Sequence, residues 1–184
     1  MAKHSQHPAE INALCEEIKG AKSILEIGSR YGEALLYFAG VLSPGAKIVS
    51  IELPGSLWGR SDSLPVLEQV IDQLKDRGFD AKLLLGNSRD QWVIDFAMSE
   101  GPYDFVFIDG DHTIEGIMAD WRNYGHMGRM VGFHDIAAIG AKLPTGELLG
   151  VPEAWSEIKW GRKYKEFIAT PEGMNPMGIG LVWE

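Results

Sequence analysis

Five short apolar runs alternate along the chain with longer segments in which apolar residues recur every three or four positions. The runs cover residues 23–27, 47–53, 81–85, 104–108 and 129–133. A short apolar run bounded by turn residues is typical of a buried strand, and recurrence at helical spacing is typical of an amphipathic helix. The alternation predicts an α/β fold, with parallel strands joined by helical crossovers and helices on both faces of the sheet.

The C-terminal part of the chain breaks this alternation. Residues 164–170 and 178–183 both have strand character, and we expect them to pair with each other in the antiparallel direction. No repeat or composition shift marks a boundary within the 184 residues, so we expect a single domain over residues 1–184.

Composition narrows the range of partners. The net charge is −9, with 26 acidic and 17 basic side chains and no basic cluster, which argues against a nucleic-acid ligand. No apolar run is long enough to cross a bilayer, and the first residues lack the apolar core of a signal peptide. Cys15 is the single cysteine, so an internal disulfide is excluded. We expect a cytoplasmic protein that does not bind membranes.

Polar residues gather where the predicted strands end. In parallel sheets ligands bind beyond the carboxyl ends of the strands, and these ends lie along one edge. The five runs are followed or closed by Glu26 with Gly28, Glu52, Asn87 with Ser88, Asp109 with His112, and His134 with Asp135. We therefore expect one binding site at this edge.

The loop after the first run decides between two kinds of nucleoside ligand. A dinucleotide-binding loop has the pattern Gly-x-Gly-x-x-Gly, whereas this loop reads Gly28-Ser29-Arg30-Tyr31-Gly32 and lacks the middle glycine. With Glu26 before it, the loop resembles motif I of the class I S-adenosylmethionine-dependent methyltransferases. That resemblance extends over nearly the whole chain, and it implies a Rossmann-like, seven-stranded, mostly parallel sheet with an antiparallel C-terminal strand.

The resemblance also implies a role for each residue of the cofactor pocket. Glu26 is expected to face the ammonium of the methionine part, and Glu52 to accept hydrogen bonds from the ribose hydroxyls. The remaining residues expected to contact S-adenosylmethionine are Gly28, Ser29, Gly32, Asn87, Ser88 and Asp109.

Residues 107–116 and 130–136 resemble a narrower branch, which contains the macrocin and mycinamicin sugar O-methyltransferases and the cephalosporin hydroxylase relatives. In that branch a divalent cation assists the reaction. The matching residues here are Asp109, His134 and Asp135 as metal ligands, with His112 and Asp109 as catalytic residues and His112 as the base. The sugar enzymes carry a carboxylate where this chain has His134.

An imidazole is a poor ligand for Mg²⁺ and a good one for Mn²⁺, Fe²⁺ or Zn²⁺. Three alternatives therefore stay open: a metal other than Mg²⁺, a Mg²⁺ held by Asp109 and Asp135 without His134, or no metal. For His112, the alternative to catalysis is a role as cap of the following helix.

These observations predict a methyltransferase that acts on a hydroxyl of a small molecule or sugar. Loop residues 136–150 are expected to form the wall of the acceptor site, and a homo-oligomer is left open. The alternatives are a nicotinamide-dependent oxidoreductase, a non-catalytic module that binds S-adenosylmethionine, and a different reaction on a similar scaffold.

Overall fold

The structure is a computed structural model that describes residues 7–55, 63–169 and 176–184. The strands are β1 (Ser23–Ile27), β2 (Lys47–Glu52), β3 (Asp80–Leu85), β4 (Tyr103–Ile108), β5 (Gly128–His134), β6 (Tyr164–Phe167) and β7 (Ile179–Trp183). The helices are α1 (Pro8–Glu17), α2 (Glu33–Ala39), α3 (Ser63–Asp76), α4 (Gln91–Glu100), α5 (Ile114–Tyr124), a 3₁₀ turn η1 (Gly125–Met127) and α6 (Val151–Ile158). The predicted alternation of strands and helices is confirmed.

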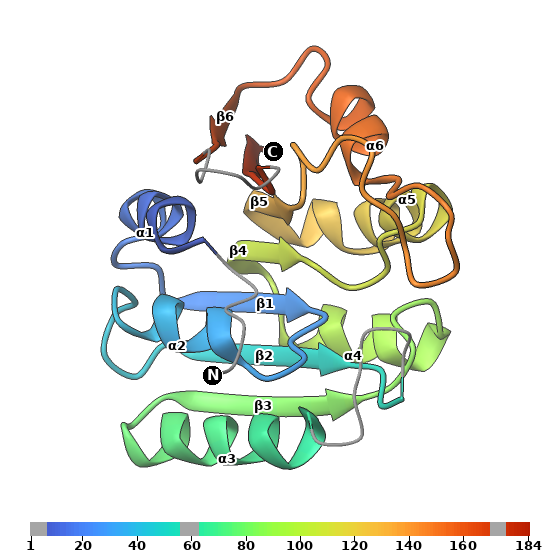
Figure 1. The fold of residues 1–184 in the computed structure, drawn as a ribbon. Helices are drawn as coiled ribbons and strands as arrows, with labels where there is room; N and C mark the ends of the chain where they lie inside the picture. The colour runs from blue at the N-terminus through green and yellow to red at the C-terminus, as the bar shows by residue number, and fades with distance from the viewer. Residues whose placement is uncertain (1–6, 56–62, 170–175) are drawn as a thin grey trace.

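All strands belong to one seven-stranded sheet with the order β3-β2-β1-β4-β5-β7-β6. Strands β1 to β5 pair in parallel, and β7 runs antiparallel to both β5 and β6. The strand arrows of β1 to β4 point the same way in Figure 1, so their carboxyl ends share one edge. The predicted Rossmann-like sheet with an antiparallel C-terminal strand is therefore confirmed.

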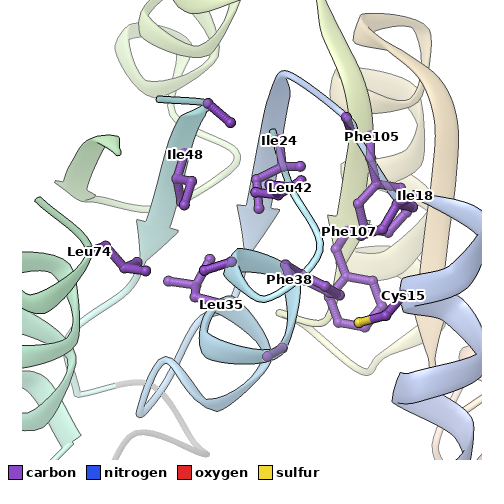
Figure 2. Packing of buried hydrophobic residues seen from close by; sticks show 14 of the residues in the cluster. Cys15, Ile18, Ile24, Leu35, Phe38, Leu42, Ile48, Leu74, Phe105 and Phe107 are labelled. Atoms are coloured by element: carbon purple, nitrogen blue, oxygen red, sulfur yellow. The ribbon is translucent and has the colours of Figure 1, made fainter. Parts of the chain in front are cut away.

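Two hydrophobic cores cover the two faces of the sheet. Helices α1, α2 and α3 pack on one face, and α4, α5 and α6 pack on the other. In the first core Phe38 of α2 lies edge-on to Phe105 and Phe107 of β4, with ring centroids 5.5 and 5.3 Å apart (Figure 2). Such aromatic packing fixes α2, and with it the loop that enters α2, against the centre of the sheet.

Backbone hydrogen bonds continue past the carboxyl ends of the strands. The Asp109 amide donates to the Ile27 carbonyl, and the Gly28 amide donates to the Ile51 carbonyl, each at 2.9 Å. The first residues after β1 and β4 are therefore held in the same layer as the sheet. This places their polar side chains at defined positions along one edge.

Within the described ranges, no helix has both the length and the apolar character needed to cross a bilayer.

A carboxyl group lies on the buried face of α5, near this edge. Asp120 is fully buried together with Ile117 and Tyr124. Burial raises the pKa of Asp120 to about 6, and the side chain of Ser88 offsets only part of this effect. The Asp120 carboxyl lies beside Gly110, in the loop that follows β4.

This carboxyl should make folding stability depend on pH. The folded-state pKa is about 6 and the unfolded value is 3.8, so the unfolded chain loses its proton first as pH rises. The contribution to stability is fully present below pH 3.8 and is lost as pH rises through 6. A shift of about two pKa units corresponds to about 3 kcal/mol. We expect Asp120→Asn, measured by urea unfolding, to remove this loss between pH 4.5 and 7.5.

The matched control is Asp95→Asn, which changes an exposed carboxyl on α4. It should leave the pH dependence of the wild type in place. If the Asp120→Asn and wild-type proteins lose the same free energy of unfolding over this pH range, Asp120 is not the group responsible.

Candidate active site

Gly28 brings the loop after β1 into backbone contact with the loop after β4. Its φ of +90° lies in the left-handed region that favours glycine. A Cβ atom at this position would overlap the backbone of Asp109 and Gly110. Gly28 is therefore required both by its backbone conformation and by the close approach of the two loops.

Glu26 is a buried carboxyl at the end of β1, with 2% of its surface exposed. Burial raises its pKa to about 8, helped by the nearby charges of Asp109 and Glu52 and opposed by a hydrogen bond from Ser29. Ser29 also accepts a hydrogen bond of 2.7 Å from the hydroxyl of Ser50 on β2. At neutral pH Glu26 is therefore mostly protonated, and a cationic group that entered this pocket would favour its ionised form.

Glu52 closes β2 and is held by the glycine loop. Its Oε2 accepts a hydrogen bond of 2.8 Å from the backbone amide of Arg30, whose φ is +48°. Burial raises the pKa of Glu52, and the amide and charge of Arg30 lower it in part. Glu26 and Glu52 thus lie at the ends of neighbouring strands, on either side of the same loop.

The other residues predicted to bind cofactor have mixed surroundings. Asn87 is half-buried, and its Oδ1 accepts a hydrogen bond of 3.0 Å from the Arg89 amide, which forms a local turn. The Ser88 carbonyl accepts a hydrogen bond of 2.6 Å from Tyr124 of α5. A side chain at Gly32 would meet Val70 of α3, so this glycine shapes the start of α2.

Two aspartates and two histidines form a closed cluster beyond β4 and β5. The Nδ1 of His112 lies 2.9 Å from Oδ2 of Asp135, and its Nε2 lies 3.7 Å from Oδ1 of Asp109. The Nδ1 of His134 lies 3.0 Å from Oδ1 of Asp135 and 3.5 Å from Oδ1 of Asp109. Each carboxylate therefore faces both imidazoles, and the two oxygens of Asp135 face different histidines.

The charges in this cluster stabilise one another. Burial works to lower the pKa of both histidines, but the carboxylates of Asp109 and Asp135 outweigh it and raise both values. Burial likewise works to raise the pKa of Asp135, but His134 and His112 hold it well below its usual range. The favoured state without a ligand is therefore a set of ion pairs between protonated imidazole and carboxylate.

The cluster also has the geometry of a cation site. Donor atoms of Asp109, His134 and Asp135 all lie within 4.8 Å of one another. Ligands that share a cation at about 2.1 Å lie about 3 to 3.4 Å apart. The distances of 3.0 and 3.5 Å from His134 Nδ1 to the two carboxylates match this spacing. These three residues therefore fit a divalent cation, and a mixed nitrogen and oxygen donor set suits Mn²⁺, Fe²⁺ or Zn²⁺ better than Mg²⁺.

The segment that carries His112 is held by contacts on two sides. Asp111 forms an ion pair with Arg89 and accepts a hydrogen bond of 2.9 Å from the Thr113 amide. The Gly150 amide donates a hydrogen bond of 2.8 Å to the His112 carbonyl, and a Cβ at Gly150 would overlap the backbone of Ile114. The loop between β5 and α6 therefore begins beside Asp135 and returns to His112 at its other end.

The structure brings the sequence-predicted residues to one edge of the sheet. Glu26 and Glu52 lie in the glycine-loop half, and Asp109, adjoining Gly28, connects it to the histidine cluster. Sequence reasoning missed Arg30 and Gly150. The place of Arg30 in the glycine loop was a usable signal, because that position needs left-handed backbone, whereas Gly150 had no local signal.

Comparisons with known proteins agree with this arrangement. The O-methyltransferase from Bacillus cereus, solved with SAH, superposes with a TM-score of 0.71 at 17% identity, over 98% of this chain and 83% of that one. TomG from Streptomyces achromogenes, an O-methyltransferase of tomaymycin synthesis solved with SAM, superposes with a TM-score of 0.70 at 17% identity, over 100% of this chain and 82% of that one. The N-terminal domain of EvdMO1, solved in the presence of SAH and D-fucose, superposes with a TM-score of 0.61 at 18% identity, over 98% of this chain and 84% of that one.

Because all these sequence identities are low, the structural similarities support the fold alone. No curated protein matches the chain by sequence. A family model described as a methyltransferase domain matches residues 25–136, more than half of the chain, and this range runs from β1 to the residue after Asp135. The chain therefore belongs to the methyltransferase-domain family, which confirms the predicted class I methyltransferase and identifies the protein as an enzyme of that kind.

Proposed function

We propose that this enzyme transfers a methyl group from S-adenosylmethionine to a hydroxyl oxygen of a small molecule or sugar, with the assistance of a divalent cation. The observation that carries the proposal is the cluster of Asp109, His112, His134 and Asp135 beside the glycine loop. One half of the edge offers carboxyl groups suited to the donor, and the other half offers a base and metal ligands suited to an acceptor hydroxyl.

The donor side is built from two buried carboxyl groups and a glycine loop. Glu26 is assigned to the ammonium of the amino-acid end and Glu52 to the ribose hydroxyls. Gly28 lets the loop that would receive the donor approach the backbone of Asp109 and Gly110, and Ser29 orients Glu26. Gly32, Asn87 and Ser88 are assigned to shaping the pocket and the adenine end. When bound, S-adenosylmethionine supplies a methyl group on a positively charged sulfur.

On the acceptor side, His112 is assigned as the base. Asp135 faces its Nδ1 at 2.9 Å, which keeps the proton of the neutral imidazole on that nitrogen and leaves Nε2 as the acceptor. His112 then takes the proton that the hydroxyl loses as the new carbon–oxygen bond forms and the carbon–sulfur bond breaks. A divalent cation held by Asp109, His134 and Asp135 supplies Lewis-acid polarisation that lowers the pKa of such a hydroxyl.

Charge and the structural neighbours support the proposed acceptor class. A net charge of −9 disfavours nucleic acid, and loop residues 136–150 are assigned to the acceptor wall because the loop joins Asp135 to the His112 segment. Figure 1 shows this orange loop on the side of the sheet to which the strands point. The tomaymycin role of TomG and the D-fucose present with EvdMO1 favour a small molecule or sugar.

We further propose a cytoplasmic enzyme with residues 1–184 as a single domain and no membrane partner. Both cores are continuous across the one sheet, and Cys15 is buried as a free thiol, which suits a reducing compartment. Whether a second copy joins the enzyme is left to measurement of its mass in solution.

Ligand-induced thermal stabilisation tests the donor. S-adenosylhomocysteine at about a hundred times its Kd should add about 2.7 kcal/mol of stability, or roughly 5 to 10 °C in Tm for a chain of this size. NADH should add nothing. Glu52→Gln should reduce the shift in Tm, because a glutamine amide cannot accept the two strong hydrogen bonds that the carboxylate is proposed to accept from the ribose hydroxyls.

A shift with NADH alone would instead support a nicotinamide-dependent oxidoreductase. Stabilisation by S-adenosylhomocysteine without methyl transfer to any of a broad panel of hydroxyl compounds would support a non-catalytic binding module.

Replacement of His112 tests the base. On an acceptor identified from that panel, His112→Ala should lower kcat by about 10²- to 10⁴-fold and leave the affinity for S-adenosylhomocysteine unchanged. Because the base must be unprotonated, the wild-type rate should fall as pH is lowered through the range in which His112 gains a proton. Unchanged turnover in His112→Ala would remove this residue as the base.

Cobalt binding tests the metal ligands without any assay of activity. Co²⁺ should bind the wild type with visible absorption bands of a nitrogen and oxygen site, and His134→Ala should weaken binding by at least about tenfold. His126→Ala, which changes an exposed histidine in η1, serves as the control and should bind normally. Equal binding in His134→Ala would leave Asp109 and Asp135 as the ligands, and no binding in the wild type would reject the metal.

A further inference from the structure

Arg30 has an unusual backbone conformation for a residue with a large side chain. Among the described residues, Arg30 and Asp135 are the only non-glycine residues with positive φ, at +48° and +65°, and both lie in the candidate site. Such a conformation costs about 1 to 2 kcal/mol relative to glycine. The backbone amide of Arg30 binds Glu52, but a glycine would donate the same hydrogen bond without strain. The backbone alone therefore does not explain an arginine here.

The side chain of Arg30 is poised for a further hydrogen-bond partner. Its Nε is buried and has no hydrogen-bond partner among the described residues. The guanidinium carbon lies 5.2 Å from the centre of the Tyr31 ring, a cation–π contact that supplies no hydrogen-bond acceptor to Nε. A buried donor without an acceptor is unfavourable, so an incoming acceptor would gain the full value of the bond.

The charges around Arg30 indicate what this acceptor is. Glu26, Glu52 and Asp109 are close enough to repel one another, and the pKa values of both glutamates are raised in consequence as well as by burial. A ligand anion entering this acidic pocket needs a positive partner. Arg30 is the one basic residue between Ser23 and Gly32 in the sequence. Its charge also acts on Glu52, which places it at the pocket rather than away from it.

We propose that the guanidinium of Arg30 binds the carboxylate of the amino-acid end of S-adenosylmethionine. This inference rests on the proposed function, since it takes the donor as given. Glu26 and Arg30 then divide the zwitterionic amino-acid group between them, with the ammonium on the glutamate and the carboxylate on the arginine. A guanidinium suits this task because its planar N–H donors match the two oxygens of a carboxylate.

The test compares ligands that differ only in the amino-acid end. S-adenosylhomocysteine carries both ammonium and carboxylate, decarboxylated S-adenosylhomocysteine lacks only the carboxylate, and 5′-methylthioadenosine lacks the whole end. Isothermal titration of the full chain should show that Arg30→Gln binds S-adenosylhomocysteine about 10- to 100-fold more weakly than wild type. The same variant should bind the other two ligands as wild type does, because neither offers a carboxylate.

Arg30→Gly checks that the effect comes from the side chain rather than the backbone. This variant keeps the amide that binds Glu52 and relieves the strain, and both offset the lost charge of Arg30 on Glu52, so thermal unfolding should show a folded protein. It should lose S-adenosylhomocysteine affinity by the same factor as Arg30→Gln. The matched control is Arg77→Gln, because Arg77 also lies over an aromatic ring, that of Phe79, but follows α3 outside the site.

Three results would overturn the inference. Wild-type affinity for S-adenosylhomocysteine in either Arg30 variant would remove the contact. A loss of the same size for all three ligands would assign Arg30 to the nucleoside end instead. Failure of the wild type to bind any of the three would reject the proposed donor itself, and is thereby distinguished from failure at Arg30.

Discussion

The backbone contact between Gly28 and the Asp109–Gly110 segment is the constraint on which the site depends. Two neighbouring parallel strands end at the same height, and their loops touch with no side chain between them. Because this contact is made by backbone, it does not vary with side-chain rotamers. The contact fixes the separation between the glycine loop and the histidine cluster, which are the halves proposed to receive the donor and the acceptor. An in-line transfer between two bound molecules needs such a fixed separation.

The electrostatics of the site have a common design on both halves. Each half concentrates carboxyl groups in a buried place, where their charges are unfavourable alone. In the histidine cluster, His112 faces Asp135 and His134 faces Asp109. Burial raises the pKa of Glu26, and a cationic group that entered its pocket would favour the ionised form.

The sequence was sufficient to predict the strands and the edge at which the polar residues gather, for a physical reason. Parallel strands buried on both faces must be apolar throughout, so polar residues such as Glu52 and Asp109 mark where they end. The strand order and the shared edge then follow from the fold class. The polar residues that these endings mark lie together in the structure, as predicted.

What the sequence did not predict depends on contacts between distant segments. Gly150 approaches the His112 segment across 38 positions, and nothing near either residue signals the contact. Asp120 follows helical spacing with Ile117 and Tyr124, but a carboxyl in an apolar stripe does not by itself distinguish burial from exposure. Such cases need the packing of whole elements, because burial is a property of the assembled core.

The position of β7 between β5 and β6 also bears on the order in which the site is assembled during synthesis. His134 at the end of β5 pairs with Ile179 of β7. A nascent chain that has emerged only as far as residue 170 already contains every residue proposed to bind the methyl donor, to act as base or to hold the metal. One flank of β5 is still an open sheet edge at that point. Addition of β7 covers this flank and brings the last residues of the described chain beside the strand that ends in His134.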